Sequence, residues 1–378
     1  MTIINLIRAA LFSAALFVQA FASVAAGAVT IDRVGPPMAH PWGMDFLDHD
    51  TVLVTLRGGG LMRVDLADGK TTEITGLPDV FDRRQGGLLD VAMIDGHVYL
   101  CYSAVLKGGS STAIDRAVIE GNALVRRQTI FTGNNPTRSG HHFGCRLQVT
   151  GGMIYASLGD RGERDNAQDP ATHAGSLIRI NLDGSIPHNN PKPDGWAPEI
   201  FSMGHRNPQG MAMHPRTGDI WTHEHGPRGG DEINITRPAR DGGANYGWPT
   251  VSHGREYVTG RRVSTHDSLP GHVDPVWVWD PSIAPSGMAF YPDAEDTNDT
   301  GKMFPDFQGH LLVGSLKFRR LYLVELDGES GLPASERVIL DGQIGRIRDV
   351  AVAPHGPFAG AILLLSDEAQ GGLYLMRR

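Results

Sequence analysis

The sequence predicts an all-β protein, a six-bladed β-propeller whose blades are four-stranded antiparallel sheets. Glycine supplies 48 and proline 24 of the 378 residues, and long runs with helical periodicity are absent, so many short strands joined by turns are expected. A short apolar strand, a turn and a second β-rich strand also recur six times along the chain. Two fused β-sandwiches would match the composition but would not explain a sixfold repeat, so the propeller is favoured.

The repeated unit defines the expected blades. Its copies begin at Gly43, Asp90, Arg146, Gly210, Gly287 and Asp349. Each interval leaves room for four short strands and loops of variable length, which is the content of a propeller blade. We therefore expect residues 27–378 to form a single propeller domain.

The first 26 residues have the layout of a secretory signal peptide, in which Arg8 is followed by an apolar run and then by small residues. Cleavage after Ala26 and cleavage after Ala28 fit equally well. No later run approaches about 18 apolar residues, so membrane insertion is not expected. The sequence thus predicts a mature protein in the periplasm or outside the cell.

The overall charge of the chain limits the classes of partner. The chain has 42 Asp and Glu against 34 Lys and Arg, a formal net charge of −8, and no basic run. This balance argues against nucleic acid or anionic lipid as a partner. The sequence leaves open whether the protein is a monomer or a homodimer.

The chain has two cysteines, Cys101 and Cys145. An oxidising compartment would preserve a disulfide between them, but pairing depends on a Cα separation that the sequence does not reveal. Two buried thiols are the favoured expectation, and a disulfide is the alternative.

The segments that precede the six first strands are expected to meet at one end of the central channel. These segments are 40–43, 85–90, 140–146, 204–210, 284–287 and 345–349, and together they carry Gln, His, Asn and several Arg. A pocket lined by such groups is the default binding site. Three longer polar connections, at 164–175, 188–198 and 253–274, are expected to shape access to this pocket.

His142 is a candidate general base. It lies near the start of the third copy, and Asp160 ends the partner strand of the same copy, so the carboxylate can reach the imidazole and fix its tautomer. His141 is equally available on spacing alone. Most of the 16 histidines are expected to be structural or exposed.

Arg346 and Arg348 form a candidate anion clamp. They are two apart on an expected strand and therefore face the same side, where two guanidinium groups would bind a polycarboxylate or a phosphate. Pairing with a neighbouring acid such as Asp349 is the alternative.

Other polar residues at strand ends fit either a binding site or an ordinary turn. Lys317 follows a strand, where a lysine is usually solvated, and Arg206 with Asn207 is as consistent with a turn-stabilising pair as with a ligand-binding pair. The segment 226–232 offers turn carbonyls and acids, and 245–248 supplies another turn nearby in sequence. Calcium takes such oxygens, but a metal-free turn remains the alternative.

At these residues the chain resembles the soluble pyrroloquinoline quinone (PQQ)-dependent sugar dehydrogenases, most closely the aldose sugar dehydrogenase branch. The matching motifs are, in order, QGGLLD, GHHFGCRL, ASLGDRG, GHRNPQGMAMHP, HEHGPRGGDEIN, NYGWP and GRIRDV. The resemblance extends from about residue 40 to the C-terminus.

The resemblance implies an enzyme that oxidises an aldose at the anomeric carbon to a lactone, with PQQ and Ca²⁺ as cofactors and an external electron acceptor. His142 would take the proton from the anomeric hydroxyl and Asp160 would orient it, while hydride passes to the quinone. Gln85 would lie at the sugar and the cofactor, and Arg206 would polarise a quinone carbonyl. The remaining cofactor-binding residues that the resemblance implies are Asn207, Lys317, Arg346 and Arg348.

The resemblance also implies two calcium sites. The carbonyls of Gly226 and Pro227 match the positions that bind the ion touching PQQ, and Glu232 with the carbonyl of Tyr246 resembles the ligands of a second, structural ion. Cys145 stands where the family pattern would have a small residue, which leaves room for thiol chemistry beside the cofactor.

Two other functions remain open from the sequence. A six-bladed lactonase would also use a metal in the channel, but it needs carboxylate ligands there and has no use for several cationic groups. A non-catalytic calcium-binding propeller would have no need of a base beside a cationic clamp.

Overall fold

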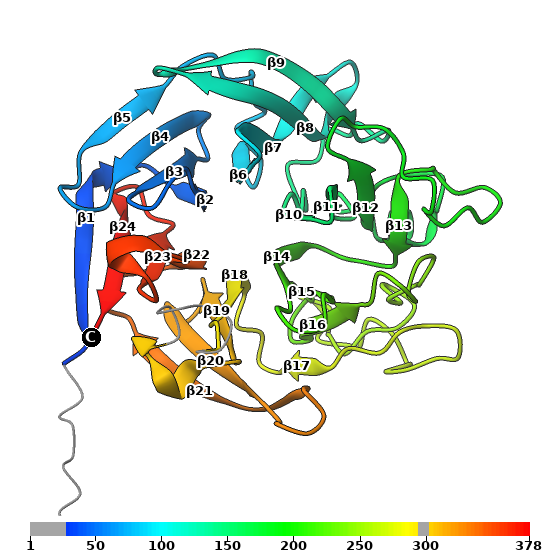
Figure 1. Cartoon of the computed structure of the whole chain (residues 1–378). Coiled ribbons are helices and arrows are strands. Elements are labelled where there is room, and N and C mark those ends of the chain that lie inside the picture. The colour runs from blue at the N-terminus through cyan, green and yellow to red at the C-terminus, as the bar shows by residue number, and fades with distance from the viewer. Residues whose placement is uncertain (1–27, 294–301) are drawn as a thin grey trace, which may run out of the picture.

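The computed structural model describes residues 28–293 and 302–378, and it forms a ring of six four-stranded sheets (Figure 1). Every strand pair within these sheets is antiparallel, as predicted; β2 with β3 is one example. The predicted signal peptide, residues 1–26, lies outside the described residues. Within the described part of the chain, no helix has the length and apolar character needed to cross a bilayer.

The sheets follow one another along the chain, and we number them as blades. Blade 1 contains β2 (Pro41–Phe46), β3 (Thr51–Leu56), β4 (Gly60–Asp65) and β5 (Thr71–Ile74). Blade 2 contains β6 (Leu88–Ile94), β7 (His97–Leu106), β8 (Gly109–Glu120) and β9 (Ala123–Thr132). Blade 3 contains β10 (Leu147–Thr150), β11 (Met153–Ser157), β12 (Ser176–Asn181) and β13 (Ile200–Met203).

The second half of the chain repeats this plan. Blade 4 contains β14 (Pro208–Met213), β15 (Ile220–Glu224), β16 (Asp231–Thr236) and β17 (Trp277–Trp279). Blade 5 contains β18 (Pro285–Phe290), β19 (Leu311–Ser315), β20 (Arg320–Leu326) and β21 (Pro333–Asp341). Blade 6 contains β22 (Ile347–Val352), β23 (Ile362–Ser366), β24 (Gly371–Arg377) and β1 (Thr30–Met38). Short 3₁₀ helices occur at Arg164–Gln168, Pro305–Phe307 and Gly356–Phe358.

The six copies predicted from the sequence are the innermost strands. Each predicted start lies in the first strand of a blade or, at Arg146, one residue before it. These strands, β2, β6, β10, β14, β18 and β22, surround the centre of the ring in Figure 1. The repeat was visible because each inner strand has the same local pattern of apolar residues.

Strand β1 closes the ring, a feature that the repeat did not reveal. It pairs antiparallel with β24, with Thr30 opposite Arg377, so the last blade combines both ends of the described chain (Figure 1). This closure ties the first strand to the last by backbone hydrogen bonds. Without β1, the outer edge of β24 would be unpaired.

A buried ion network joins inner strands of different blades. The guanidinium group of Arg146 contacts Asp90 at 3.2 Å and Asp349 at 2.9 Å, which joins blades 2, 3 and 6. A Cβ atom on Gly287 would lie 2.2 Å from Oδ1 of Asp349, so only glycine fits at that point. Burial and the neighbouring Asp349 raise the pKa of Asp90 to about 7, although Arg146 opposes the shift.

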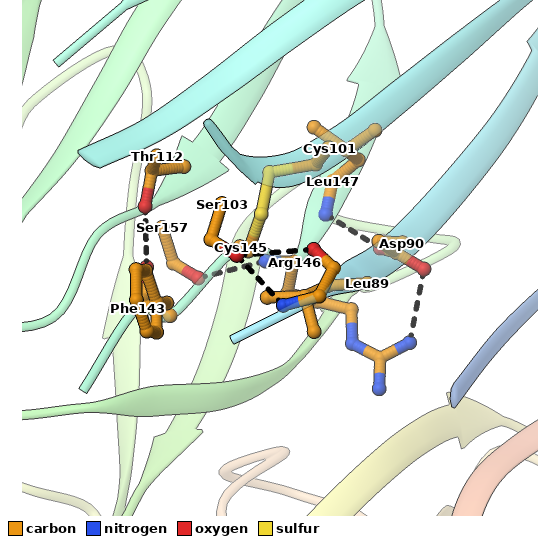
Figure 2. Close-up of a disulfide and its surroundings, with 12 residues drawn as sticks. Leu89, Asp90, Cys101, Ser103, Thr112, Phe143, Cys145, Arg146, Leu147 and Ser157 are labelled. Carbon is orange, nitrogen blue, oxygen red and sulfur yellow. Dashed lines mark hydrogen bonds and ion pairs between the residues drawn. A yellow bond between two sulfur atoms is a disulfide. The ribbon is translucent and has the colours of Figure 1, made fainter. Parts of the chain in front are cut away.

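Cys101 and Cys145 form a disulfide, so the expectation of two thiols was wrong, and so was the room left for thiol chemistry beside the cofactor (Figure 2). Their Cα atoms are 5.6 Å apart, within the range that a disulfide requires. Cys101 lies in β7 of blade 2, and Cys145 lies just before β10 of blade 3. Neighbouring blades bring them together across 44 residues of sequence, and the sequence alone does not show that contact.

Candidate active site

A cavity of about 760 Å³ opens at one end of the channel, and the residues that precede the inner strands line it. Each of the six entry segments contributes a lining residue: His40, Gln85, Gly144, Asn207, Ala284 and Arg346. The predicted convergence of these segments is therefore confirmed. It follows from the topology, because every inner strand starts at the same end of the ring.

A second cavity of about 850 Å³ adjoins the first, and both are lined by Gln85, His225, Ala284 and Lys317. His142 and Arg206 line this second cavity, together with Gly226 and Pro227. Arg255 and Tyr257 form part of its wall, so the long connection 253–274 does shape this site, as expected.

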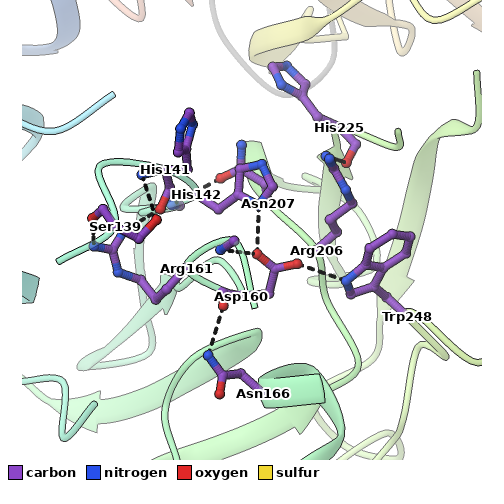
Figure 3. Close-up of polar contacts among 12 residues, drawn as sticks. Ser139, His141, His142, Asp160, Arg161, Asn166, Arg206, Asn207, His225 and Trp248 are labelled. Carbon is purple, nitrogen blue, oxygen red and sulfur yellow. Dashed lines mark hydrogen bonds and ion pairs between the residues drawn. The ribbon is translucent and has the colours of Figure 1, made fainter. Parts of the chain in front are cut away.

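The imidazole of His142 is bonded to the carboxylate of Asp160 (Figure 3). Nδ1 of His142 and Oδ1 of Asp160 are 2.6 Å apart, and Asp160 is 1% exposed. Burial alone would raise the pKa of Asp160, but the bond to His142 and the charge of Arg206 hold it below its usual range. The ionised carboxylate therefore accepts the Nδ1 proton, which leaves Nε2 of His142 as a proton acceptor.

Three further groups hold this pair in place. Nε1 of Trp248 donates to Oδ2 of Asp160 at 2.9 Å, and the amide of Gly162 donates to Oδ1 at 2.7 Å. The backbone amide of His142 donates to Oε1 of Gln85 at 2.7 Å. Gln85 thus positions the predicted base as well as lining both cavities.

Arg206 and Asn207 stabilise a turn, which is one of the two roles that the sequence left open, and each also lines a cavity. Their backbone amides donate to the buried carboxylate of Glu224, which stabilises the turn. The guanidinium group of Arg206 donates to the carbonyl of His225 at 2.8 Å and lies over the ring of Trp248 (Figure 3). Oδ1 of Asn207 accepts the amide of Gly144 at 3.3 Å.

Arg346 and Arg348 face the same side, as predicted, but their acidic partner is Asp367. Nη2 of Arg348 lies 3.0 Å and Nη2 of Arg346 lies 3.7 Å from Oδ2 of Asp367, which follows β23. Asp349, the neighbour suggested by the sequence, instead pairs with Arg146. Arg348 and Asp349 therefore have different partners although they are adjacent in sequence.

Asp367 is expected to stabilise the fold at neutral pH. Burial raises its pKa, but Arg348, the bond to His40 and Arg346 together lower it well below its usual value of 3.8. A depressed pKa stabilises the fold above the unfolded value, and this contribution is lost as pH falls through the folded value. We expect Asp367→Asn to lower the free energy of unfolding by about 2 kcal/mol at pH 7 and by less at pH 3.

Urea unfolding at the two pH values measures this difference. The matched control is Asp341→Asn, which removes a carboxylate from an exposed pair with Arg320 and should change stability little. An equal loss at pH 7 and pH 3 for Asp367→Asn would contradict the assignment.

Cationic side chains predominate in the first cavity although the chain is acidic. Arg57, Arg84, Lys317, Arg346 and Arg348 line it, against Asp367 and Glu368. Lys317 lies in the turn after β19, where its Nζ donates to the carbonyl of Ser282 at 2.8 Å. Among the described residues, Nε of Arg206 and Nε of Arg348 have no hydrogen-bond partner although both atoms are buried.

The residues expected to bind calcium lie in two places. Gly226 and Pro227 line the second cavity, and the hydroxyl of Ser282 donates to the Pro227 carbonyl at 3.2 Å. Glu232 lines a small cavity with Glu224 that shares Gly226 with the second cavity, and Tyr246 does not line it. Burial and the Glu224 carboxylate raise the pKa of Glu232 to about 8. The described residues contain no cluster of three His, Cys, Asp or Glu side chains suited to a metal ion.

Sequence reasoning missed three residues of the site. Trp248 supports Asp160, Asp367 joins the two clamp arginines, and His225 lines both cavities. Burial lowers the pKa of His225 to about 3, so its imidazole is neutral. Trp248 stands within the NYGWP motif, which was the only available signal for it.

The fold and the site define a class of protein: a six-bladed propeller with a buried His–Asp pair beside a cationic cavity at the channel end. The family model described as "Glucose / Sorbosone dehydrogenase" matches residues 38–375. The chain therefore belongs to the glucose/sorbosone dehydrogenase family, a family of oxidoreductases, as the motifs predicted.

Individual relatives agree with this assignment. The chain is 36% identical over 360 residues to aldose sugar dehydrogenase YliI of Escherichia coli, covering 91% of this chain and 92% of that protein. A crystal structure of the soluble aldose sugar dehydrogenase from Escherichia coli in the apo form matches with a TM-score of 0.83 at 35% identity, covering 92% of this chain and 99% of that one. The PQQ-bound form of aldose sugar dehydrogenase from Streptomyces coelicolor matches with a TM-score of 0.73 at 25% identity, covering 93% and 98%.

Proposed function

We propose that this protein oxidises aldose sugars at the anomeric carbon to lactones, with PQQ and Ca²⁺ as cofactors. The observation that carries the proposal is the His142–Asp160 pair, whose imidazole lines a cavity that adjoins the cationic one. The relatives named above are described as aldose sugar dehydrogenases, and one of them is described as PQQ-bound. We also propose that residues 1–26 are a signal peptide, whose removal would leave the enzyme in the periplasm or outside the cell, where an external acceptor would take the electrons.

The first cavity fits PQQ, which carries three carboxylates. Arg346 and Arg348 offer two guanidinium groups on one side, Lys317 offers an ammonium group, and Asn207 offers an amide. The cationic side chains gathered in this cavity of an otherwise acidic protein favour the binding of an anionic ligand there.

The chain's own residues account for the proton transfer. Nε2 of His142 accepts the proton of the anomeric hydroxyl, because Asp160 fixes Nδ1 as the protonated nitrogen. Asp160 then stabilises the imidazolium that forms. PQQ supplies a quinone that accepts the hydride. Arg206 lines the same cavity as His142, and its guanidinium group would donate a hydrogen bond to an oxygen of the bound cofactor.

Calcium fits the oxygen atoms at two positions. Ca²⁺ is a hard ion that takes backbone carbonyls and carboxylates, which is what Gly226, Pro227 and Glu232 provide. Glu232 and Glu224 repel each other in a small buried space, so a cation there would relieve an unfavourable interaction. At the cofactor, Ca²⁺ supplies Lewis acidity. The carbonyl of Tyr246 is proposed as a further ligand of the ion at Glu232.

Replacing Glu232 with glutamine should change the stability of the fold in opposite directions with and without calcium. Without calcium the variant should be at least as stable as the wild type, because a repulsion is removed. Calcium at 100 times its Kd for a site should stabilise the wild type by about 2.7 kcal/mol through that site. The variant should lose the part of the calcium-dependent stabilisation that comes from the ion at Glu232. Thermal unfolding with EGTA or with calcium measures this, and Glu329→Gln on the exposed surface is the control. An undiminished calcium response in Glu232→Gln would remove Glu232 from the ligand set.

Titration of the purified, metal-loaded protein with PQQ tests the proposed function at the level of binding. A saturable change in visible absorbance at one PQQ per chain is the expected result. The absence of any change, with the protein folded and calcium present, would leave the lactonase and the non-catalytic propeller as the functions to test.

A further inference from the structure

We propose that the Cys101–Cys145 disulfide is a positioning element of the active site, which holds the loop 139–146 so that His142 meets Asp160. Its catalytic consequence rests on the proposed function, whereas its effect on the loop does not. The two sulfurs join β7 of blade 2 to this loop, only three residues beyond His142 (Figure 2).

The loop has a backbone conformation that it would not keep unaided. His142 has φ of 51° and Cys145 has φ of 72°, which is the left-handed region that residues with a Cβ atom rarely adopt. Gly144 between them has φ of 63°, and a Cβ atom there would lie 2.6 Å from the carbonyl oxygen of Ser157. Such conformations persist only where the surrounding structure enforces them.

Blade 3 confines one side of the loop and also carries Asp160. The amide of Cys145 donates to the carbonyl of Ser157 in β11 at 2.6 Å. A Cβ atom on Gly159 would lie 2.4 Å from the carbonyl oxygen of His142, so the backbone there is in close contact. The guanidinium group of Arg161 lies 3.4 Å from the ring centre of Phe143 and donates to the carbonyl of His141.

Residues of blade 2 and of the segment that precedes it contact the other side of the loop. Thr112 in β8 donates to the carbonyl of Phe143 at 2.9 Å (Figure 2). Oε1 of Gln85 accepts the amide of His142. The disulfide is the covalent member of this group. It therefore limits how far the His142 loop can shift relative to blade 2, and such a shift would lengthen the 2.6 Å contact with Asp160.

The alternative is that the disulfide only stabilises the fold. Both cysteines are fully buried in the apolar core between blades 2 and 3, so their removal will lower stability in either case. A matched control must therefore lose stability without touching the loop. Leu100 meets this need, because it neighbours Cys101 in β7 but packs in a different core cluster, the one shared with blade 1.

The experiment compares the double variant Cys101→Ala/Cys145→Ala with Leu100→Ala. In the cofactor-free proteins, hydrogen exchange at the amides of His142 and Gly144 should accelerate at least about 10-fold in the double variant relative to Leu100→Ala. In the reconstituted enzyme, kcat should fall roughly 10- to 100-fold in the double variant, since a displacement of about 1 Å costs that much. The Kd for PQQ should rise by a smaller factor than kcat falls, because Arg346, Arg348 and Lys317 lie outside this loop, whereas only Phe143 and Gly144 of the loop line the first cavity.

Two results would overturn the proposal. One is loop exchange and kcat equal to those of Leu100→Ala at matched loss of stability, which would make the disulfide purely stabilising. The other is a parallel loss of PQQ affinity and kcat, which would indicate general loosening of the blades. If the wild type itself shows no PQQ-dependent activity, the proposed function fails, while the exchange measurement still decides whether the disulfide positions the loop.

Discussion

Replacing His142 with alanine is expected to lower kcat by about two orders of magnitude or more while PQQ still binds. The imidazole is the group bonded to the buried, ionised Asp160, and its Nε2 is the proton acceptor beside the cavity. The positions of the clamp arginines, Arg346 and Arg348, and of Lys317 do not depend on the imidazole. Steady-state kinetics and a PQQ absorbance titration separate the two effects.

His141 provides the control for this prediction. It is adjacent in sequence and lies beside His142 in Figure 3, but it has no bond to Asp160. His141→Ala should keep kcat within about threefold of the wild type, since a residue outside the proton path contributes little. Unchanged kcat in His142→Ala, or an equal loss in both variants, would remove His142 from the role of base.

Replacing Arg348 with glutamine is expected to weaken PQQ binding by about 100-fold or more, because truncating one partner of a buried charge pair costs about 2–5 kcal/mol. Arg348 is 8% exposed, lines the cavity, and has an Nε atom without a partner among the described residues. Isothermal titration or absorbance titration with PQQ measures the change. Bound at saturation, the variant should retain a measurable kcat, because the His142–Asp160 pair is untouched.

Arg320 offers a control with the same change of charge. It lies at the start of β20, near the turn that holds Lys317, but it pairs with Asp341 and lines neither cavity. Arg320→Gln should leave the Kd for PQQ within about threefold of the wild type, as expected of an exposed pair. A Kd in Arg348→Gln that matches the one in Arg320→Gln would show that Arg348 does not hold the cofactor.

The fold could be predicted from the sequence because its signal is local and repeated. Each inner strand has its own apolar pattern and its own entry segment, so six copies implied six blades and one shared pocket. The partner strand β1 escaped prediction because its pairing with β24 spans the whole chain. Sequence patterns indicate a strand, but they do not say which distant strand it joins.

The same distinction applies to the site. The His142–Asp160 contact was predicted because both residues belong to one copy of the repeat. Asp349, the alternative acidic partner that the sequence offered for the clamp arginines, pairs with Arg146, and Arg348 pairs with Asp367. The disulfide was only the alternative expectation, and the Trp248 bond to Asp160 was not expected at all. Each joins segments that are distant in sequence and that only the packing of the blades brings together.

Dye-linked oxidation of a panel of aldoses by the purified protein, with and without added PQQ and calcium, is the decisive test of the proposed function. We expect activity that requires both additions and that ranks the sugars by kcat/KM. Absence of activity toward every aldose with both cofactors present, in a protein that is folded, would contradict the claim that this propeller is a PQQ-dependent sugar dehydrogenase.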